Sequence, residues 1–145
     1  MYRTDATPDR SLLIVAFGGK VFAVDRFTGE QRWKTKLDDW DASVVELAIG
    51  PEVLIAVSSK RLAILRYASG ELVKSVDRSQ HERGIGRTVA LIDGNFLYLG
   101  RYGSAACYTL AGEFVWEQYF SGEGQCEAAL GFPGNVRQAD DRGAK

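Results

Sequence analysis

The strongest constraint on the fold is an internal repeat. A Gly-Glu pair occurs three times, at Gly29-Glu30, Gly70-Glu71 and Gly112-Glu113, so the spacings are 70 − 29 = 41 and 112 − 70 = 42 residues. Apolar segments separated by a turn precede each pair, and a polar stretch with a further apolar segment follows it. The chain therefore contains three copies of one unit, which must stack to bury their apolar faces.

Each unit is predicted to hold four short strands. The first strand is expected at Leu12–Phe17, with counterparts at Val53–Val57 and 96–99, and nearly every position in it is apolar. Such a strand is buried on both faces, as between two layers. The second strand, at 21–25 in the first unit, leads into a tight turn, and the third carries a Trp in two of the units. We expect an all-β fold of three four-stranded blades, because this period is typical of a β-propeller.

The same period sets the predicted organisation of the chain. Residues 11–134 hold the blades, at about 11–51, 52–94 and 95–134, and the fourth strand of the first blade is expected to end at Gly50-Pro51. Residues 1–10 form an N-terminal extension. The segment 135–145 is almost wholly polar and is predicted to be a tail without strands.

One segment of the first unit carries a family pattern. Ala23, Asp25, Thr28, Gly29 and Trp33 stand as A-x-D-x-x-T-G-x-x-x-W. This pattern resembles the repeat of the pyrroloquinoline-quinone-type β-propellers, which also occurs in noncatalytic scaffolds resembling outer-membrane assembly lipoproteins. The second unit departs from it, with Arg66 in place of the Asp and Lys74 in place of the Trp, and the third unit keeps Gly112 and Trp116 without the Asp.

The residues of the pattern are predicted to have structural roles. We expect the Asp25 side chain to accept hydrogen bonds from backbone N–H groups of the turn that Thr28 and Gly29 make. Gly29, Gly70 and Gly112 are expected to close the turns, where positive φ favours glycine. Trp33 and Trp116 are expected to wedge between neighbouring blades, since large aromatics that recur with a repeat usually fill its core.

The composition excludes several classes of protein. The 18 basic and 19 acidic side chains give a net charge of −1, so we expect no nucleic-acid partner. No segment is long and apolar enough to span a membrane, and the N-terminal residues have no apolar signal core, so we expect a cytoplasmic protein. Cys107 and Cys126 are expected to be free, buried thiols.

No pattern of catalytic or metal-binding residues stands out, so we expect no enzyme and no cofactor. His81 is the single histidine and is expected on a solvated loop. The cluster of Asp38, Asp39 and Asp41 fits a solvated turn better than a cation site. The family resemblance implies that the quinone-dependent dehydrogenases need a complete ring, calcium ligands and an adjacent cysteine pair, and this chain's two cysteines are not adjacent.

The function that remains is a noncatalytic interaction module that presents loops on a rigid face to a protein partner. The partner-binding residues are predicted to be Trp40, Arg83, Arg87, Arg101 and Tyr102. A cytosolic, toxin-neutralising immunity-type protein is one alternative. A fragment or relative of a quinone-dependent oxidoreductase is the alternative from another class.

Three blades form an open arc, because known propellers close with four to eight. The arc is expected to expose apolar side chains at both ends. These are Leu13, Val15 and Phe17 at one end, and Phe96, Tyr98 and Phe114 at the other. We expect a second copy to close the ring as a homodimer of 2 × 3 = 6 blades, in preference to a different protein that completes the propeller.

Overall fold

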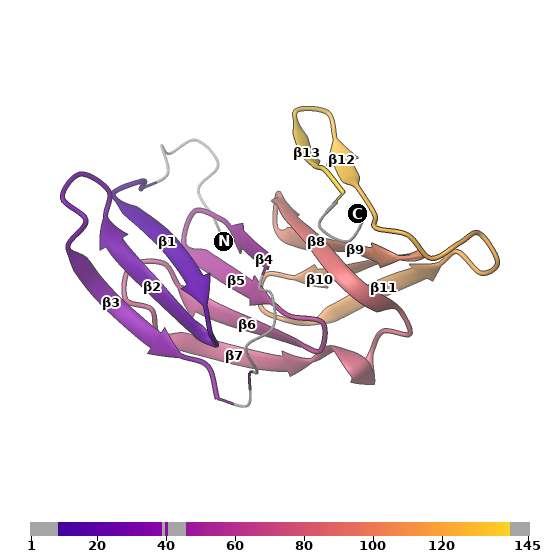
Figure 1. Ribbon diagram of the computed structural model, residues 1–145, viewed down its shortest axis with the longest axis horizontal. Coiled ribbons are helices and arrows are strands. Elements are labelled where there is room, and N and C mark those ends of the chain that lie inside the picture. Colours follow the sequence, from indigo (N-terminus) through magenta and orange to yellow (C-terminus); the bar gives the residue numbers. More distant parts are fainter. Residues whose placement is uncertain (1–8, 39, 41–45, 140–145) are drawn as a thin grey trace.

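The computed structural model describes residues 9–38, 40 and 46–139. Within these ranges the chain is all-β: it forms antiparallel strands and a single short 3-10 helix, η1 (Arg78–Gln80). Three sheets stand side by side in chain order, and a small hairpin follows the third (Figure 1). The predicted fold class is confirmed, with four-stranded antiparallel sheets as the repeated unit.

The sheets are built as follows. The first sheet contains β1 (Leu12–Phe17), β2 (Lys20–Asp25) and β3 (Gln31–Lys36). The second contains β4 (Glu46–Ile49), β5 (Val53–Val57), β6 (Arg61–Arg66) and β7 (Leu72–Asp77). The third contains β8 (Ile85–Asp93), β9 (Phe96–Tyr102), β10 (Ser104–Thr109) and β11 (Phe114–Tyr119). The hairpin pairs β12 (Leu130–Phe132) with β13 (Asn135–Arg137).

The sheets are offset by one strand from the units predicted in the sequence. The strand that ends before Gly50-Pro51 was assigned to the first unit, but β4 pairs with β5 in the second sheet. The Gly50 N–H donates to the carbonyl of Val53 and closes a hairpin between them. β8 joins the third sheet in the same way, so among the described residues the first sheet has only three strands.

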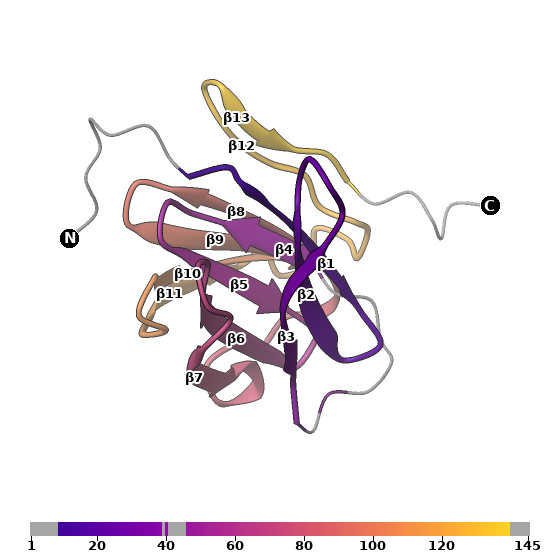
Figure 2. The ribbon, with the colours of Figure 1, turned by 90° about the vertical axis from the view of Figure 1, so that its left-hand side faces the viewer.

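The core lies between the sheets. One apolar cluster joins the first and second sheets, and a second cluster joins the second and third. The middle sheet is covered on both faces, so every residue of β5 is buried. Figure 2 shows the same stack of sheets from the side of β1 to β3.

Trp33 fixes the junction between the first two sheets. Its indole Nε1–H donates to the carbonyl of Tyr67, at 3.0 Å, and Thr35 of the same strand donates to the carbonyl of Gly70. The indole ring lies directly over Gly70, so a Cβ at that position would overlap it. Gly70 also has a φ of +75°, so this glycine serves the turn and the packing together.

The turn before Trp33 is held by Asp25. Its carboxylate accepts hydrogen bonds from the N–H groups of Phe27 and Thr28, at 2.8 and 2.9 Å. These bonds hold the pKa of Asp25 below its usual value. Gly29 closes the same turn with a φ of +77°.

Trp116 does not wedge between two described blades, in contrast to the expectation. It lies on the outer face of the third sheet and is 42% exposed. At the second junction Lys74 stands in the place of Trp33, with its aliphatic chain beside Gly112. The reason is position in the chain: no further four-stranded sheet follows the third among the described residues, so Trp116 has no glycine turn opposite it.

The prediction of a strandless tail from residue 135 is wrong for its first three residues. Asn135–Arg137 is β13, and the side chains of Asn135 and Arg137 donate to the carbonyls of Ile92 and Ala90, at 2.8 and 3.0 Å. These bonds hold the hairpin beside β8, as Figure 1 shows. Residues 140–145, like residues 1–8 of the predicted extension, lie outside the described ranges.

We predict that Gly70→Ala destabilises the protein much more than Gly94→Ala. Both glycines have positive φ, +75° and +62°, so both substitutions add backbone strain of about 1 kcal/mol. Only the Cβ at position 70 overlaps a side chain, whereas the Cβ at position 94 meets no atom within 4 Å. We expect an additional loss of about 1–3 kcal/mol for Gly70→Ala, from urea denaturation. Equal losses would show that Trp33 does not set this junction.

Candidate interaction surfaces

The first candidate surface is the outer face of the first sheet. Leu13, Val15 and Phe17 of β1 point away from the second sheet and are 57%, 37% and 61% exposed. Side chains alternate along a strand, so their neighbour Ile14 is buried in the junction. The ring of Phe17 stacks on that of Phe22 at 5.1 Å and extends the face across β2. We call this surface the N-face.

The second candidate surface is the outer face of the third sheet. It carries Phe96, Tyr98 and Trp116, with the rings of Tyr98 and Trp116 6.4 Å apart. Phe96 is 39% exposed, and Tyr98 is partly covered by the edge of Phe132 from β12, at 4.9 Å. We call this surface the C-face.

Phe114 was also expected on the C-face, and the structure places it elsewhere. Its ring packs edge-on against Tyr108, at 5.5 Å, in the core between the second and third sheets. His81 stacks on the Phe114 ring at 5.2 Å and is itself exposed in a turn, as expected for a histidine on a solvated loop. A register shift beside Tyr108 in the β10–β11 ladder lets Phe114 and Trp116 point to opposite faces.

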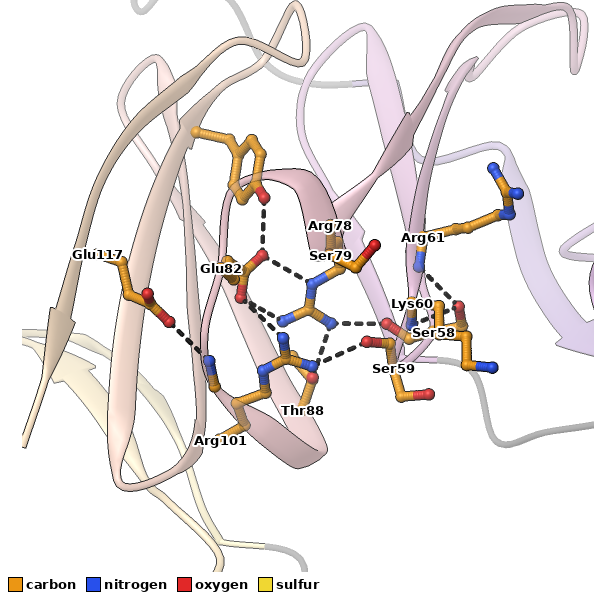
Figure 3. A network of polar contacts seen from close by, with 12 residues as sticks. Ser58, Ser59, Lys60, Arg61, Arg78, Ser79, Glu82, Thr88, Arg101 and Glu117 are labelled. Atoms are coloured by element: carbon orange, nitrogen blue, oxygen red, sulfur yellow. Dashed lines mark hydrogen bonds and ion pairs between the residues drawn. The ribbon is translucent and has the colours of Figure 1, made fainter. Parts of the chain in front are cut away.

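A buried ionic network ties the second sheet to the third, and Figure 3 shows its geometry. The guanidinium of Arg78 is fully buried and makes two hydrogen bonds to the carboxylate of Glu82, at 2.8 and 2.9 Å. It also donates to the carbonyl of Ser58 and to the hydroxyl of Thr88. Arg78 thus connects η1 to the turn before β6 and to β8.

The same carboxylate serves two further groups of the third sheet. Tyr108 donates its hydroxyl to Glu82 at 2.7 Å, and Arg101 lies 3.4 Å from the other carboxylate oxygen. Arg101 also donates to the carbonyl of Ser59, across the junction (Figure 3). Burial raises the pKa of Glu82, but the hydrogen bonds and charge of Arg78, with Tyr108 and Arg101, outweigh it and hold this pKa below its ordinary value.

The predicted partner-binding residues do not form one patch. Arg101 is 4% exposed and engaged in the network, so its prediction as a surface contact is wrong. Trp40 packs against the core between the first and second sheets. Arg83 lies over the ring of Tyr119, at 4.9 Å, and Tyr102 donates to Glu127. Arg87 is half-buried at the start of β8.

This network was not predicted from the sequence. Arg78 and Glu82 lie in the polar segment around His81, which was interpreted as a solvated loop because charged residues are mostly exposed. Their spacing of four residues is the one local sign of a pair. The contact with Arg101 depends on the strands that bring the two segments together.

The remaining titratable residues that the structure describes were compared with the predictions. In the ranges that the structure describes, no three His, Cys, Asp or Glu side chains gather as a metal site. Asp39 and Asp41 of the predicted acidic turn lie outside those ranges. Cys107 is buried, which raises its pKa, but Cys126 is exposed, so its predicted burial is wrong. Within the described residues, no helix has the length and apolar character needed to cross a bilayer.

Comparisons with known proteins agree with this architecture. A family model described as outer membrane protein assembly factor BamB matches residues 3–128. The crystal structure of BamB from Moraxella catarrhalis superposes with a TM-score of 0.58 and 24% identity, over 75% of this chain and 33% of that one. The structure of U3-55K gives a TM-score of 0.66 and 16% identity, over 85% and 40% of the two chains.

A third structure, quinohemoprotein alcohol dehydrogenase from Comamonas testosteroni, gives a TM-score of 0.59 and 18% identity, over 75% of this chain and 19% of that one. No curated protein matches the chain. The identities are low, so these structures show the fold alone, a propeller. The chain spans 33% of the BamB structure and 40% of the U3-55K structure.

We predict that Glu82→Gln costs about 3–5 kcal/mol of stability, because it leaves two buried arginines without a counter-charge. The matched control is Glu71→Gln. That residue pairs with Arg66 at 3.0 Å, but both side chains of the pair are exposed, so its loss is expected to cost less than about 1 kcal/mol. Urea denaturation of both variants measures the difference. A loss for Glu82→Gln no larger than that for Glu71→Gln would contradict the account.

The network also predicts a pH dependence. The pKa of Glu82 is lower in the folded chain than in the unfolded one, so its contribution to stability is fully present above the ordinary value of about 4.3. That contribution is lost as the pH falls through the folded-state pKa. Tyr108→Phe removes one hydrogen bond from the carboxylate and raises its folded-state pKa toward the unfolded value. We therefore expect the variant to be less stable at pH 6 and to lose less further stability as the pH falls. Urea denaturation between pH 3 and 6 measures this, with Tyr119→Phe as control, and identical profiles for the two variants would exclude the mechanism.

Proposed function

Because the chain belongs to the family described as outer membrane protein assembly factor BamB, a family of PQQ-like propeller repeats, we propose that it is a noncatalytic propeller module that binds a protein partner. The fold supports a protein-interaction scaffold at this coarse level. The proposal goes beyond the fold in assigning partner binding to the N-face and the C-face. Its cytoplasmic location stays a prediction.

The observation that carries the proposal is the pair of open end faces. The N-face exposes Leu13 and Phe17 by more than half, and the C-face exposes Trp116 on its edge strand β11. Contiguous apolar surfaces of this kind mark sites of protein–protein contact. Each buried Å² of apolar surface contributes about 25 cal/mol, so a partner that covers these side chains gains affinity directly from them.

The buried charges support a noncatalytic role. Glu82 pairs with both Arg78 and Arg101 between the second and third sheets, and these ion pairs hold the sheets together. His81 packs against the ring of Phe114. The likeness to the alcohol dehydrogenase is one of fold, and we assign no redox role from it.

The proposal is tested with the tagged chain as bait in its own cell extract. We expect Leu13→Asp to abolish capture of the partner, because it places a charge among the exposed apolar side chains of the N-face. Val73→Asp is the matched control. Val73 is an exposed apolar residue of β7 in the middle sheet, away from both end faces, and its substitution is expected to leave capture intact.

Two results would contradict the proposal. One is an unchanged set of captured proteins with Leu13→Asp, which would show that the N-face binds nothing. The other is a tightly bound chromophore that absorbs visible light and is reduced by a substrate, since such a group would make the chain an enzyme.

A further inference from the structure

At each junction a long side chain of one sheet packs at a glycine of the next sheet. The C-face carries such a side chain and the N-face belongs to the sheet that carries such a glycine. Within the chain, Trp33 of the first sheet lies over Gly70 of the second, and Lys74 of the second lies beside Gly112 of the third. At the two ends of the described arc, one member of this pair is present without the other: a large side chain at one end and a glycine turn at the other. Trp116 is 42% exposed on the C-face, and a Cβ at Gly29 on the first sheet would meet no atom within 4 Å.

The match extends to the strands that flank these residues. Trp33 lies opposite Ala23 on the neighbouring strand, and Trp116 lies opposite Cys107. Gly29 and Gly70 have nearly the same φ, +77° and +75°. The turns that carry them also share a hydrogen-bond pattern, because each glycine N–H donates to the carbonyl four residues before it, at 2.8 Å. The two ends therefore have the geometry of the observed junction.

The strand count shows the same complementarity. Among the described residues the first sheet lacks the strand that β4 and β8 supply to the other two sheets. β12 follows the third sheet just as β4 follows the first, and its Leu130 packs over Gly100 on the C-face. Leu47 of β4 has the equivalent place in the junction of the first and second sheets. One end of the arc thus holds the strand that the other end lacks.

We propose that the partner of these faces is a second copy of this chain, and this rests on their proposed role as binding surfaces. Trp116 of each copy packs on Gly29 of the other, and β12 of each copy pairs with the outer edge of β1 of the other, beyond Leu12, whose N–H and carbonyl are bonded to the Tyr67 hydroxyl. β1 takes the place of β13, a strand of three residues of which Val136 and Arg137 are exposed. The two contacts are identical and head-to-tail, so two copies close a six-bladed ring.

The first experiment measures the mass of the full-length chain in solution by light scattering. We expect a species of 2 × 16.0 = 32.0 kDa. Trp116→Ala is expected to weaken association by about 30-fold at each contact, the usual effect of a buried interface tryptophan, and to give the single-chain mass. Its circular dichroism stays that of the folded chain, because Trp116 is half exposed there. Val73→Ala, also exposed but on the middle sheet, keeps the mass of two copies.

A mixing experiment tests the head-to-tail geometry. Trp116→Ala damages only the C-face, and Leu13→Asp damages only the N-face, so each variant alone has both contacts of the ring broken. A mixture of the two restores one intact contact. We therefore expect a two-chain species in the mixture and in neither variant alone.

Several results would overturn the inference. A wild-type chain of 16.0 kDa that stays soluble, or a Trp116→Ala variant that keeps the mass of two copies, excludes this ring. Failure of the mixture to associate excludes the head-to-tail contact. If the chain remains single while Leu13→Asp still abolishes capture of a different protein, the second-copy inference fails and the proposed function stands.

Discussion

The contact on which the structure depends is the packing of one sheet face on the next, with a long side chain seated over a glycine. Trp33 over Gly70 sets the distance and angle of the first junction, and Lys74 beside Gly112 repeats the arrangement at the second. A side chain at Gly70 would overlap the indole ring of Trp33, and one at Gly112 would crowd the side-chain ends of Ile64 and Lys74. Because these glycines also need positive φ to turn the chain, the turn and the stacking of the blades depend on the same residue.

Much of the architecture was predictable because its signals are local. The period near 42 residues, the glycine turns and the apolar strands predicted an all-β chain of repeated sheets, and the resemblance of the first unit predicted the propeller family. The assignment of β4 failed because local patterns do not tell which neighbouring sheet a strand joins. β13 was missed because three residues between Asn135 and Arg137 are too few to show a strand period.

The exposed surfaces were predictable from the sequence, whereas the buried charges were not. Exposure of Leu13 and Phe17 followed from the position of β1 at the start of the arc, and Trp116 stands exposed at the other end for the corresponding reason. The network of Arg78, Glu82 and Arg101 was not predictable, since charged residues in a polar segment are usually solvated. Its burial depends on the contact between Glu82, which follows η1, and Arg101 of β9, and only the folded chain brings these two residues together.

The central claim is that a further blade covers each end of the arc, and hydrogen exchange of the β1 backbone tests it most directly. Among the described residues β1 is an edge strand, so in the single chain its outward amides, except that of Leu12 bonded to Tyr67, exchange rapidly with solvent. The account predicts that β1 amides become protected as protein concentration rises, because a strand from the second copy pairs with them, while β5 amides stay protected throughout. Rapid exchange of β1 at every concentration would contradict the claim.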